Sequence, residues 1–404
     1  MADGDSIVGI LRGGLMRLLG THKFSVSVVM VAALSTGAGV GLLGVCGPFT
    51  DVAADVFCPF VLEIFYLGIT TGTTATTYDP ASNVSRLQMA AFLSRTVDGV
   101  LKRGSRRAAL DQFWTSQNDT VLAITTVGST PLFVASDGAD VWVSNFSTNS
   151  VSRVRASDGK LLETWTGASG AHVVLVAMGR IFIMGTNIPP SLYQIDPSQA
   201  AGAVTTVATN LGGPFGGAFD GSRIWATNLG PPGSVSIVTP GATIPWTVTT
   251  VTAGFNRLYG ALYDGANVWV TDWGAGTLAK LDGSGAVLQT VTVETHPQIP
   301  IFDGTNIWVP NTDSGSVSVV RASSGTVLAT LTGNGLNGPV AAAFDGQRIL
   351  VTNNPGDTVS LWKAADLTTL GSFPTGAATN PYDACSDGIS FWVTLQNVGK
   401  LARF

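Results

Sequence analysis

The stretch AFDGQRILVTNN, from Ala343 to Asn354, is written several times in this 404-residue chain. Close variants are IFDGTNIWVPNT from Ile301, LYDGANVWVTDW from Leu262 and AFDGSRIWATNL from Ala218. Each variant joins two short apolar runs through an Asp-Gly pair, which is a preferred dipeptide of tight hairpin turns. The chain is therefore built from repeated hairpins, and the spacing of the Asp-Gly pairs gives the size of the repeated unit.

Seven copies of this hairpin follow one another at steps of 39 to 44 residues. Each copy divides into four segments of strand length, rich in Val, Ile and Thr and bounded by Gly, Asn, Asp or Ser. This period, with four strands in each copy, is typical of a propeller blade. We therefore predict an all-β fold, a seven-bladed β-propeller over residues 119–404. The turn positions are Asp137, Met178 (a degenerate copy), Asp220, Asp264, Asp303, Asp345 and Asp387.

The two ends of this region predict how the ring closes. The seventh repeat stops at Phe404, before its fourth strand. The segment TVLAITTVG, residues 120–128, precedes the first repeat and resembles TVLATLTGN of residues 326–334. Closed propellers leave no free sheet edge. We therefore expect the N-terminal strand to complete the seventh blade.

The repeated residues are expected to have structural roles. The turn glycines adopt positive φ, and the aspartate before each accepts local backbone hydrogen bonds. One large side chain in each repeat should pack between neighbouring blades. These are Trp142, Phe182, Trp225, Trp269, Trp308, Leu350 and Trp392. Residues three positions further on are expected to cap a turn, and they are Asn145, Asn228, Asp272, Asn311 and Asn353.

The composition excludes some classes of partner and site. The net charge is −5 and only 12% of residues are charged, so there is no basic stripe for a nucleic acid. The one dense basic cluster, near residues 102–107, is interpreted as a solvated face beside a linker at 104–118. No Cys-x-x-Cys or Cys/His metal spacing occurs, so we expect neither a metal nor a cofactor. Cys46 and Cys58 are candidates for a disulfide if the protein is exported, which leaves Cys385 single and buried in a strand.

The start of the chain predicts export. No charged residue occurs from Phe24 to Thr50, and three basic residues precede this apolar run. A positive region, an apolar core and then small residues form a secretory signal. Residues 1–45 are therefore interpreted as a signal peptide. The alternative is a retained membrane anchor, because the run can reach spanning length. The letters LGVC, ending at Cys46, also leave lipidation open.

Residues 46–103 follow a helical pattern and predict a small α-helical module. Asp51 is expected to cap its first helix. Ser85 and Gln88 have the spacing of a capping box at the start of the second helix. The apolar stripes of the two helices are Phe57, Val61, Ile64 and Leu67, and Met89, Leu93, Val97 and Leu101.

This module resembles the S-layer homology family from Phe49 through Arg95. The family's F-x-D-V, Gly-Ile, aromatic-x-P and Thr-Arg-Ala-Glu motifs correspond to Phe49-Thr50-Asp51-Val52, Gly68-Ile69, Tyr78-Asp79-Pro80 and Ser85-Arg86-Leu87-Gln88. Gln88 replaces the family's glutamate, and one copy is present. Members of the family anchor proteins to anionic polymers of the bacterial wall, so the resemblance implies that Arg86, with Asp51, binds a wall polymer. The alternative is that Arg86 is only a solvated residue at the start of a helix.

Residues 120–404 are similar to the YVTN/YncE-like group of seven-bladed bacterial propellers. A related ring, virginiamycin B lyase, uses a histidine and a glutamate-held magnesium on one face. The histidines of this ring are His172 and His296, and Glu294 lies two residues before the second. A histidine near a carboxylate is a conceivable acid–base pair. The lyase's repeated Trp-Phe-Thr-Glu pattern is absent from this sequence. We therefore do not transfer its metal site, and we expect no catalytic residues.

The loops that lead into the first strand of each blade meet at one end of the ring, which we call the mouth. Aromatic and amide side chains there suit a glycan or a peptide segment. The candidates for this ligand face are Phe215, Asn256, Arg257, Tyr259, His296, Asn337, Asn380 and Tyr382. The alternative for each of these residues is loop packing.

The sequence therefore predicts an exported protein of the bacterial cell surface. An S-layer-homology-like module would bind a cell-wall polymer or glycan, and a non-catalytic propeller would bind a glycan or a protein. A membrane partner is expected only if the N-terminal segment is retained. The first alternative is an extracellular lyase or hydrolase acting at the mouth, and the second is a structural surface-layer subunit.

Overall fold

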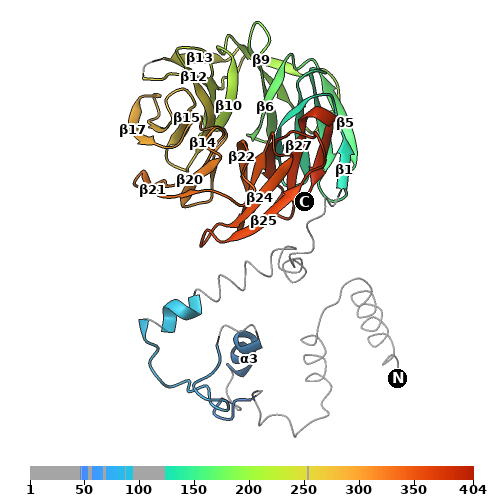
Figure 1. Ribbon diagram of the computed structural model, residues 1–404. Coiled ribbons are helices and arrows are strands. Elements are labelled where there is room, and N and C mark those ends of the chain that lie inside the picture. Colours follow the sequence, from blue (N-terminus) through green and yellow to red (C-terminus); the bar gives the residue numbers. More distant parts are fainter. Residues whose placement is uncertain are drawn as a thin grey trace, which may run out of the picture. The chain divides into compact units, whose positions relative to one another are not determined.

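The computed structural model describes residues 46, 48–52, 57–66, 70–86, 88–93, 123–252 and 254–404 (Figure 1). The chain divides into two compact units, Met1–Ser105 and Arg106–Phe404. The predicted signal segment at 1–45 and the predicted linker at 104–118 lie outside the described residues. Within the described ranges, no helix has both the length and the apolar character needed to cross a membrane.

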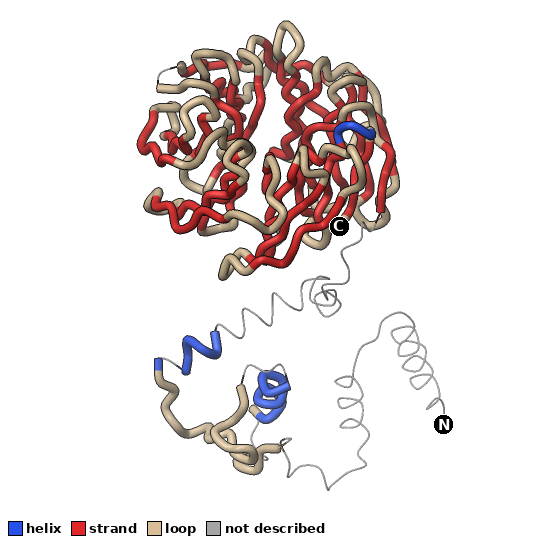
Figure 2. The backbone as a smooth tube through the Cα atoms, viewed as in Figure 1, coloured by secondary structure: helices blue, strands red, loops and turns tan. Residues whose placement is uncertain are grey.

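The second unit is built almost wholly of strands, which form seven four-stranded antiparallel sheets around a ring (Figure 2). In six sheets the four strands are consecutive in sequence. Blades 1 to 3 contain β2 (Pro131–Ser136), β3 (Asp140–Asn145), β4 (Ser150–Arg155) and β5 (Leu161–Thr166); β6 (Ala171–Ala177), β7 (Arg180–Gly185), β8 (Ser191–Ile195) and β9 (Thr205–Thr209); and β10 (Pro214–Phe219), β11 (Ile224–Asn228), β12 (Ser234–Thr239) and β13 (Thr247–Val251).

Blades 4 to 6 repeat this order, and blade 7 is completed from the other end of the chain. Blades 4 to 6 contain β14 (Leu258–Tyr263), β15 (Val268–Asp272), β16 (Thr277–Leu281) and β17 (Val287–Thr292); β18 (Ile301–Phe302), β19 (Asn306–Asn311), β20 (Ser316–Arg321) and β21 (Thr326–Leu331); and β22 (Pro339–Phe344), β23 (Arg348–Asn353), β24 (Thr358–Lys363) and β25 (Thr369–Pro374). Blade 7 contains β26 (Pro381–Ser386), β27 (Phe391–Leu395), a short 3₁₀ turn (Gln396–Val398), β28 (Lys400–Arg403) and β1 (Ala123–Thr126).

The predicted closure of the ring is confirmed. Strand β1 pairs antiparallel with β28, from Ala123 opposite Arg403 to Thr126 opposite Lys400. The first strands of all seven blades contact one another in a closed cycle, β2, β6, β10, β14, β18, β22, β26 and back to β2. These seven strands therefore line the axis of the ring, and the loops that lead into them lie at one common end.

The Asp-Gly pair forms the turn between the first and second strands of a blade. In blade 5, Gly304 has φ of 92°, and one carboxylate oxygen of Asp303 accepts hydrogen bonds from the backbone of Thr305 and Asn306 at 2.8 and 2.7 Å. Glycine is needed at this positive φ because a Cβ atom would strain the backbone. The predicted local role of the aspartate is therefore confirmed.

The other carboxylate oxygen of this aspartate has a role that the sequence did not predict. It accepts a hydrogen bond from the indole Nε1 of the buried tryptophan of the same blade, at 2.7 to 2.9 Å in five blades. The two blades without this tryptophan lack the bond for different reasons. Blade 2 has Met178 in the turn, and in blade 6 the carboxylate of Asp345 binds Arg348 instead. One aspartate thus fixes both a turn and the tryptophan that packs against the next blade.

The blade-to-blade packing predicted for the large repeated side chains is confirmed. Trp225 lies in a cluster with residues of blade 4, and Trp308 in a cluster with residues of blade 6. A side-chain hydroxyl group adds a hydrogen bond between neighbouring blades. Thr394 Oγ1 of blade 7 donates to the backbone carbonyl of Leu132 in blade 1 at 2.7 Å, and Thr352 Oγ1 of blade 6 donates to that of Tyr382 in blade 7 at 2.8 Å.

The turn-capping role predicted for the repeated asparagines is wrong at four of the five positions. Asn311 is fully buried, and its amide donates across the hairpin to Ser316 and Ser318 of the third strand at 3.2 and 3.0 Å. Asn145, Asn228 and Asn353 make the equivalent pairs of bonds. The amide can donate twice, so it links two hydroxyl groups inside the sheet. Asp272 has no amide and caps the backbone of Ala275.

The first unit contains α3 (Cys58–Tyr66) and a second helix over residue 86 and residues 88–93. The structure joins Cys46 to Cys58 by a disulfide with a Cα–Cα distance of 5.6 Å. Phe49 is fully buried and packs against the rings of Phe65 and Tyr78 at centroid distances of 5.0 and 5.7 Å. The small core of this unit is therefore built around the first residue of the F-x-D-V motif.

Two predictions for the helices of this unit are wrong. Met89 and Leu93 are 47% and 60% exposed, so the stripe predicted to be buried faces solvent in the part of the helix that the structure describes. Of the first stripe, Val61 is buried but Phe57 is 64% exposed. Helical spacing identifies which residues share a face, but it does not show whether another element covers that face.

The hydrogen bond between the turn aspartate and the tryptophan can be tested in blade 5. Trp308 and Trp362 are both almost fully buried, but only Trp308 donates its indole N–H to a turn aspartate. Replacing either tryptophan by Phe removes similar volume. We therefore expect Trp308→Phe to lower the free energy of unfolding more than Trp362→Phe does, by about 1 to 2 kcal/mol, because Asp303 loses a hydrogen-bond donor. Urea unfolding of the two variants measures the difference, and equal losses would contradict this role.

Candidate functional site

The first candidate site is the start of the second helix of the S-layer-homology-like unit. The predicted capping box is confirmed, because Ser85 N donates to Gln88 Oε1 at 2.8 Å and Gln88 N donates to Ser85 Oγ at 3.2 Å. Arg86 is exposed and lies inside this box, so its backbone is held while its side chain is in solvent. A guanidinium in this setting is available to an anionic ligand.

Asp51, the second predicted wall-polymer residue, has a different environment. Its carboxylate accepts hydrogen bonds from the backbone of Tyr78 and Asp79, at 2.9 and 2.6 Å, and does not cap α3, which begins at Cys58. The bond from Tyr78 is the main reason that the pKa of Asp51 is lowered from 3.8. Asp51 therefore ties the F-x-D-V motif to the aromatic-x-P motif, while Gly68 and Ile69 of the remaining motif lie outside the described residues.

The predicted ligand-face residues of the propeller fall into two groups. Phe215, Tyr259 and Tyr382 lie on first strands, in β10, β14 and β26. The other five lie in the loops that lead into first strands, at the mouth. They are Asn256, Arg257, His296, Asn337 and Asn380.

The three aromatic residues belong to a set that crosses the axis. The ring centroids of His172 and Phe215 are 4.5 Å apart, and those of Phe215 and Tyr259 are 5.5 Å apart. The hydroxyl groups of Tyr259 and Tyr382 are 2.7 Å apart. Phe133 closes the cycle, at 5.9 Å from Tyr382 and 5.1 Å from His172. Side chains from five blades thus form a cycle of ring contacts around the axis.

His172, one of the two histidines considered for acid–base chemistry, is therefore a packing residue of the axis. It is 4% exposed, its Nδ1 has no hydrogen-bond partner, and burial lowers its pKa from 6.5 to about 3. The imidazole is consequently neutral at physiological pH. With its pKa so far below physiological pH it is a weak base, and it is too buried to reach a ligand at the mouth.

Sequence reasoning missed Asp383, which lies beside this aromatic set in β26. It is 5% exposed, and its carboxylate accepts a hydrogen bond from the backbone of Val134 in blade 1 at 3.0 Å. Burial raises its pKa from 3.8 to about 7, and the bond from Val134 opposes the rise. The signal in the sequence was a charged residue inside a first strand, where the other blades carry uncharged residues.

His296 pairs with a different acid from the one that the sequence suggested. Its Nδ1 lies 2.6 Å from a carboxylate oxygen of Asp313 in the β19–β20 loop, while Glu294 is exposed. The ring of His296 stacks on Trp273, with centroids 3.7 Å apart and planes 5° apart. The guanidinium carbon of Arg257 lies 5.3 Å from the centre of the Trp273 ring.

These four residues form what we call the ladder: Arg257, Trp273, His296 and Asp313. They come from four loops at the mouth, β13–β14, β15–β16, β17–β18 and β19–β20. The sequence placed Arg257 and His296 at the mouth but missed Trp273 and Asp313. Trp273 directly follows the repeated Asp272, and this second tryptophan after the repeated one was the available signal.

The remaining mouth residues contribute mainly their backbone. Asn256 N donates to Asp272 at 2.7 Å, and Asn380 N donates to Asp357 at 2.8 Å. The side chains of Asn256 and Asn337 are exposed. These loops are therefore held by carboxylates that accept backbone hydrogen bonds, which leaves the amide side chains in solvent.

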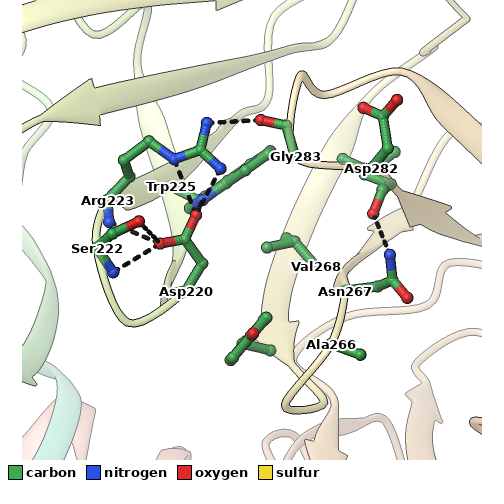
Figure 3. A pocket seen from close by; sticks show the side chains of 11 residues that line it. Asp220, Ser222, Arg223, Trp225, Ala266, Asn267, Val268, Asp282 and Gly283 are labelled. Carbon is green, nitrogen blue, oxygen red and sulfur yellow. Dashed lines mark hydrogen bonds and ion pairs between the residues drawn. The ribbon is translucent and has the colours of Figure 1, made fainter.

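A pocket of about 180 Å³ lies at the opposite end of blades 3 and 4 (Figure 3). Arg223 crosses it, with an ion pair to Asp220 at 2.8 Å and a hydrogen bond to the carbonyl of Gly283 at 2.6 Å. Burial would raise the pKa of Asp220, but its hydrogen bonds, led by that from Trp225, lower it to about 2. Arg223 and Asp220, which line the pocket, are already paired with each other. The pocket is therefore a weaker candidate for a ligand site than the mouth. Among the described residues no three His, Cys, Asp or Glu side chains gather as a metal site requires.

The two units are similar to different groups of known proteins. Residues 48–90 match the S-layer homology domain family, and a domain of this family implies association with the cell surface. No curated protein matches the chain.

The propeller is similar in fold to solved lyase structures. A streptogramin B lyase structure matches with a TM-score of 0.57 and 16% identity, over 70% of this chain and 96% of that one. A catalytically inactive virginiamycin B lyase from Staphylococcus aureus with quinupristin matches with a TM-score of 0.58 and 14% identity, over 70% and 98%. The selenomethionine-substituted form of that lyase gives the same values. At this identity the likeness shows the propeller fold and nothing about activity.

The buried carboxyl of Asp383 predicts a pH-dependent stability. Its pKa is higher in the folded protein than in the unfolded chain, so its favourable contribution is complete below about pH 4 and is lost as the pH rises through 7. Asp383→Asn keeps an oxygen for the Val134 N–H but cannot ionise. We expect this variant to match the wild type near pH 4 and to be more stable at pH 8, by on the order of 4 kcal/mol. Unfolding measured from pH 4 to 8 tests this, and a constant difference between the two proteins would refute it.

Proposed function

We propose that this chain is an exported protein of the bacterial cell surface that binds a wall polymer through its S-layer homology domain and presents its propeller as a non-catalytic binding face. The observation that carries the first part is the match of residues 48–90 to that domain family, together with the exposed Arg86 held in a capping box. Arg86 would contact the anionic polymer directly, and Asp51 would hold the module's two motifs together.

The propeller part of the proposal rests on the construction of the mouth. The aromatic set lies around the axis, and the loops of the rim carry the polar side chains that a ligand would meet. Those loops present exposed amides, a guanidinium and an imidazole. Such groups suit recognition of hydroxyl, amide and charged groups of a glycan or a protein segment.

Wall association can be tested by sedimenting the full chain with purified bacterial sacculi. Arg86→Ala should reduce binding about tenfold or more, since a charge-assisted hydrogen bond is lost. Alanine is a good helix former, so the helix itself should persist. Arg180→Ala, which removes an arginine on the propeller surface, is the matched control and should sediment like the wild type. Equal sedimentation of both variants would remove Arg86 from the proposal, and a wild type that stays in the supernatant would remove wall binding.

One observation favours a second candidate, a lyase or hydrolase acting at the mouth. The Nδ1 atom of His296 lies 2.6 Å from a carboxylate oxygen of Asp313, and no described residue forms a hydrogen bond with Nε2 of that ring. A carboxylate that orients a histidine in this way is found where the free nitrogen transfers a proton. His296 also has φ of 57°, a left-handed conformation that non-glycine residues rarely adopt.

The two candidates give opposite results with quinupristin as a probe. Under the proposed non-catalytic function, the full chain leaves quinupristin unchanged during prolonged incubation followed by chromatography. Conversion by the wild type that is abolished in His296→Ala and retained in Glu294→Ala would establish catalysis at the mouth and overturn the non-catalytic proposal. Glu294 is the matched control because it is an exposed acid in the same loop, while the carboxylate bonded to His296 is that of Asp313.

A further inference from the structure

Arg257 differs from the other arginines of the ring that lie over an aromatic side chain. Arg153, Arg223 and Arg348 each pair with an aspartate at 2.7 or 2.8 Å. Arg403 donates to Ser390 and to the carbonyl of Ser157. Their charges are therefore satisfied within the fold.

The guanidinium of Arg257 has no such partner. Its Nε is buried without a hydrogen bond, and its one side-chain interaction among the described residues is the contact with Trp273. Asp272, the nearest acid in sequence to Trp273, uses its carboxylate on the backbone of Asn256, Arg257 and Ala275. A partly buried guanidinium without an acceptor is costly, and a bound oxyanion would remove that cost.

The ladder is also held rigidly in place. Asp272 accepts the backbone N–H of Arg257, whose own carbonyl accepts from Trp273 N at 2.8 Å. On the other side, His296 is stacked on Trp273, tied to Asp313, and bonded through its carbonyl to Thr312 N at 3.1 Å. A cation fixed in this way loses little conformational entropy when it binds, which is the advantage of a preorganised site.

The surroundings favour a saccharide over a peptide as the bearer of the anion. None of the large exposed apolar residues lies in the four loops that carry the ladder, so there is no anchor for an apolar peptide side chain. The exposed amide of Asn256, next to Arg257 in sequence, can exchange hydrogen bonds with a ligand. Amides and aromatic residues around a fixed cation match a sugar that carries a carboxylate or a phosphate.

We propose that Arg257, held against Trp273 at the mouth, binds the oxyanion of an anionic saccharide. This inference rests on the proposed role of the propeller as a binding face and narrows it to one class of ligand. His296 and Asp313 act as positioning residues, since they fix the ring of Trp273 on which Arg257 rests.

Calorimetric titration of the full chain tests this with four probes: tetragalacturonate, its methyl ester, mannose 6-phosphate and neutral galactotetraose. We expect tetragalacturonate to bind, and its methyl ester and galactotetraose to bind at least about tenfold more weakly, because a charged hydrogen bond is lost. Mannose 6-phosphate binding as well would assign the site to both oxyanions, and its failure would restrict the class to carboxylates.

Variants locate the site. Arg257→Ala should weaken tetragalacturonate binding about tenfold or more, Arg257→Lys less, and Arg180→Ala not at all. Wild-type affinity in Arg257→Ala, or equal binding of the methyl ester, would overturn the inference. Preferential binding of the acetylated peptide Ac-Ala-Ala-Ala-Ala over every saccharide would overturn the choice of ligand class.

The two proposals fail in different ways. If Arg257→Ala loses tetragalacturonate but sediments with sacculi like the wild type, the two sites are independent, as proposed. If the propeller binds galactotetraose and ignores the charged probes, the ring is a binding face and this inference is wrong. If no saccharide and no peptide binds while Arg86 still supports sedimentation, the role of the propeller as a binding face fails along with this inference, and wall association remains.

Discussion

A ring of blades is stable only if its last junction is made as well as the others, and in this chain that junction joins residues far apart in sequence. Strand β1 pairs with β28, and across the same junction Thr394 of blade 7 bonds the carbonyl of Leu132 in blade 1. Asp383 adds a second contact there, to Val134. Closing so long a loop costs entropy that local contacts do not repay, so several interactions must form together at this point. All the other blades depend on this closure, because an open ring would expose two sheet edges.

Within the closed ring, each blade is tied to its own turn and to its neighbour by few polar groups. The turn aspartate holds the Asp-Gly hairpin with one oxygen and the tryptophan with the other, and that tryptophan packs into the next blade. A substitution of the turn aspartate is therefore expected to disturb the packing of that tryptophan against the next blade. Blade 2 illustrates the coupling, since it lacks both the aspartate and the tryptophan and packs Phe182 against Trp246 of blade 3 at 5.7 Å. Blade 6 differs again, since it keeps the aspartate but has Leu350 in place of the tryptophan, and Asp345 binds Arg348.

The sequence predicted the features that repeat and missed those that do not. A period of 39 to 44 residues, seven turns and a displaced strand were enough to derive the blades and the closure. Which side chains meet across the ring could not be derived in the same way. His296 was assigned to Glu294, two residues away, but its partner is Asp313 in another loop. His172 was considered for acid–base chemistry, but it lies in β6 among the aromatic residues of the axis, where burial keeps it neutral. Met89 and Leu93 were expected to be buried but are exposed. Helical spacing shows which residues share a face, and it does not show whether another element covers that face.

The ladder lies beside a blade that departs from the repeat in its first strand and in the loop before it, and this supports a function there. Blade 5 has the shortest first strand, Ile301–Phe302, among the described strands, and Pro310 stands where Thr352 and Thr394 supply the junction hydroxyl in blades 6 and 7. The loop before that strand holds His296 at positive φ. The hydroxyl contact to blade 6 is made by Thr312 instead, whose Oγ1 donates to the carbonyl of Pro339 at 2.8 Å. The short strand and the positive φ have a cost, in fewer hydrogen bonds between strands and a strained backbone. A blade with a full-length first strand and a relaxed loop before it would avoid these costs. Departures of this kind occur where a protein gives up stability for a functional site. Here they lie next to the ladder, in which the guanidinium of Arg257 lies over Trp273 and lacks a hydrogen-bond acceptor among the described residues.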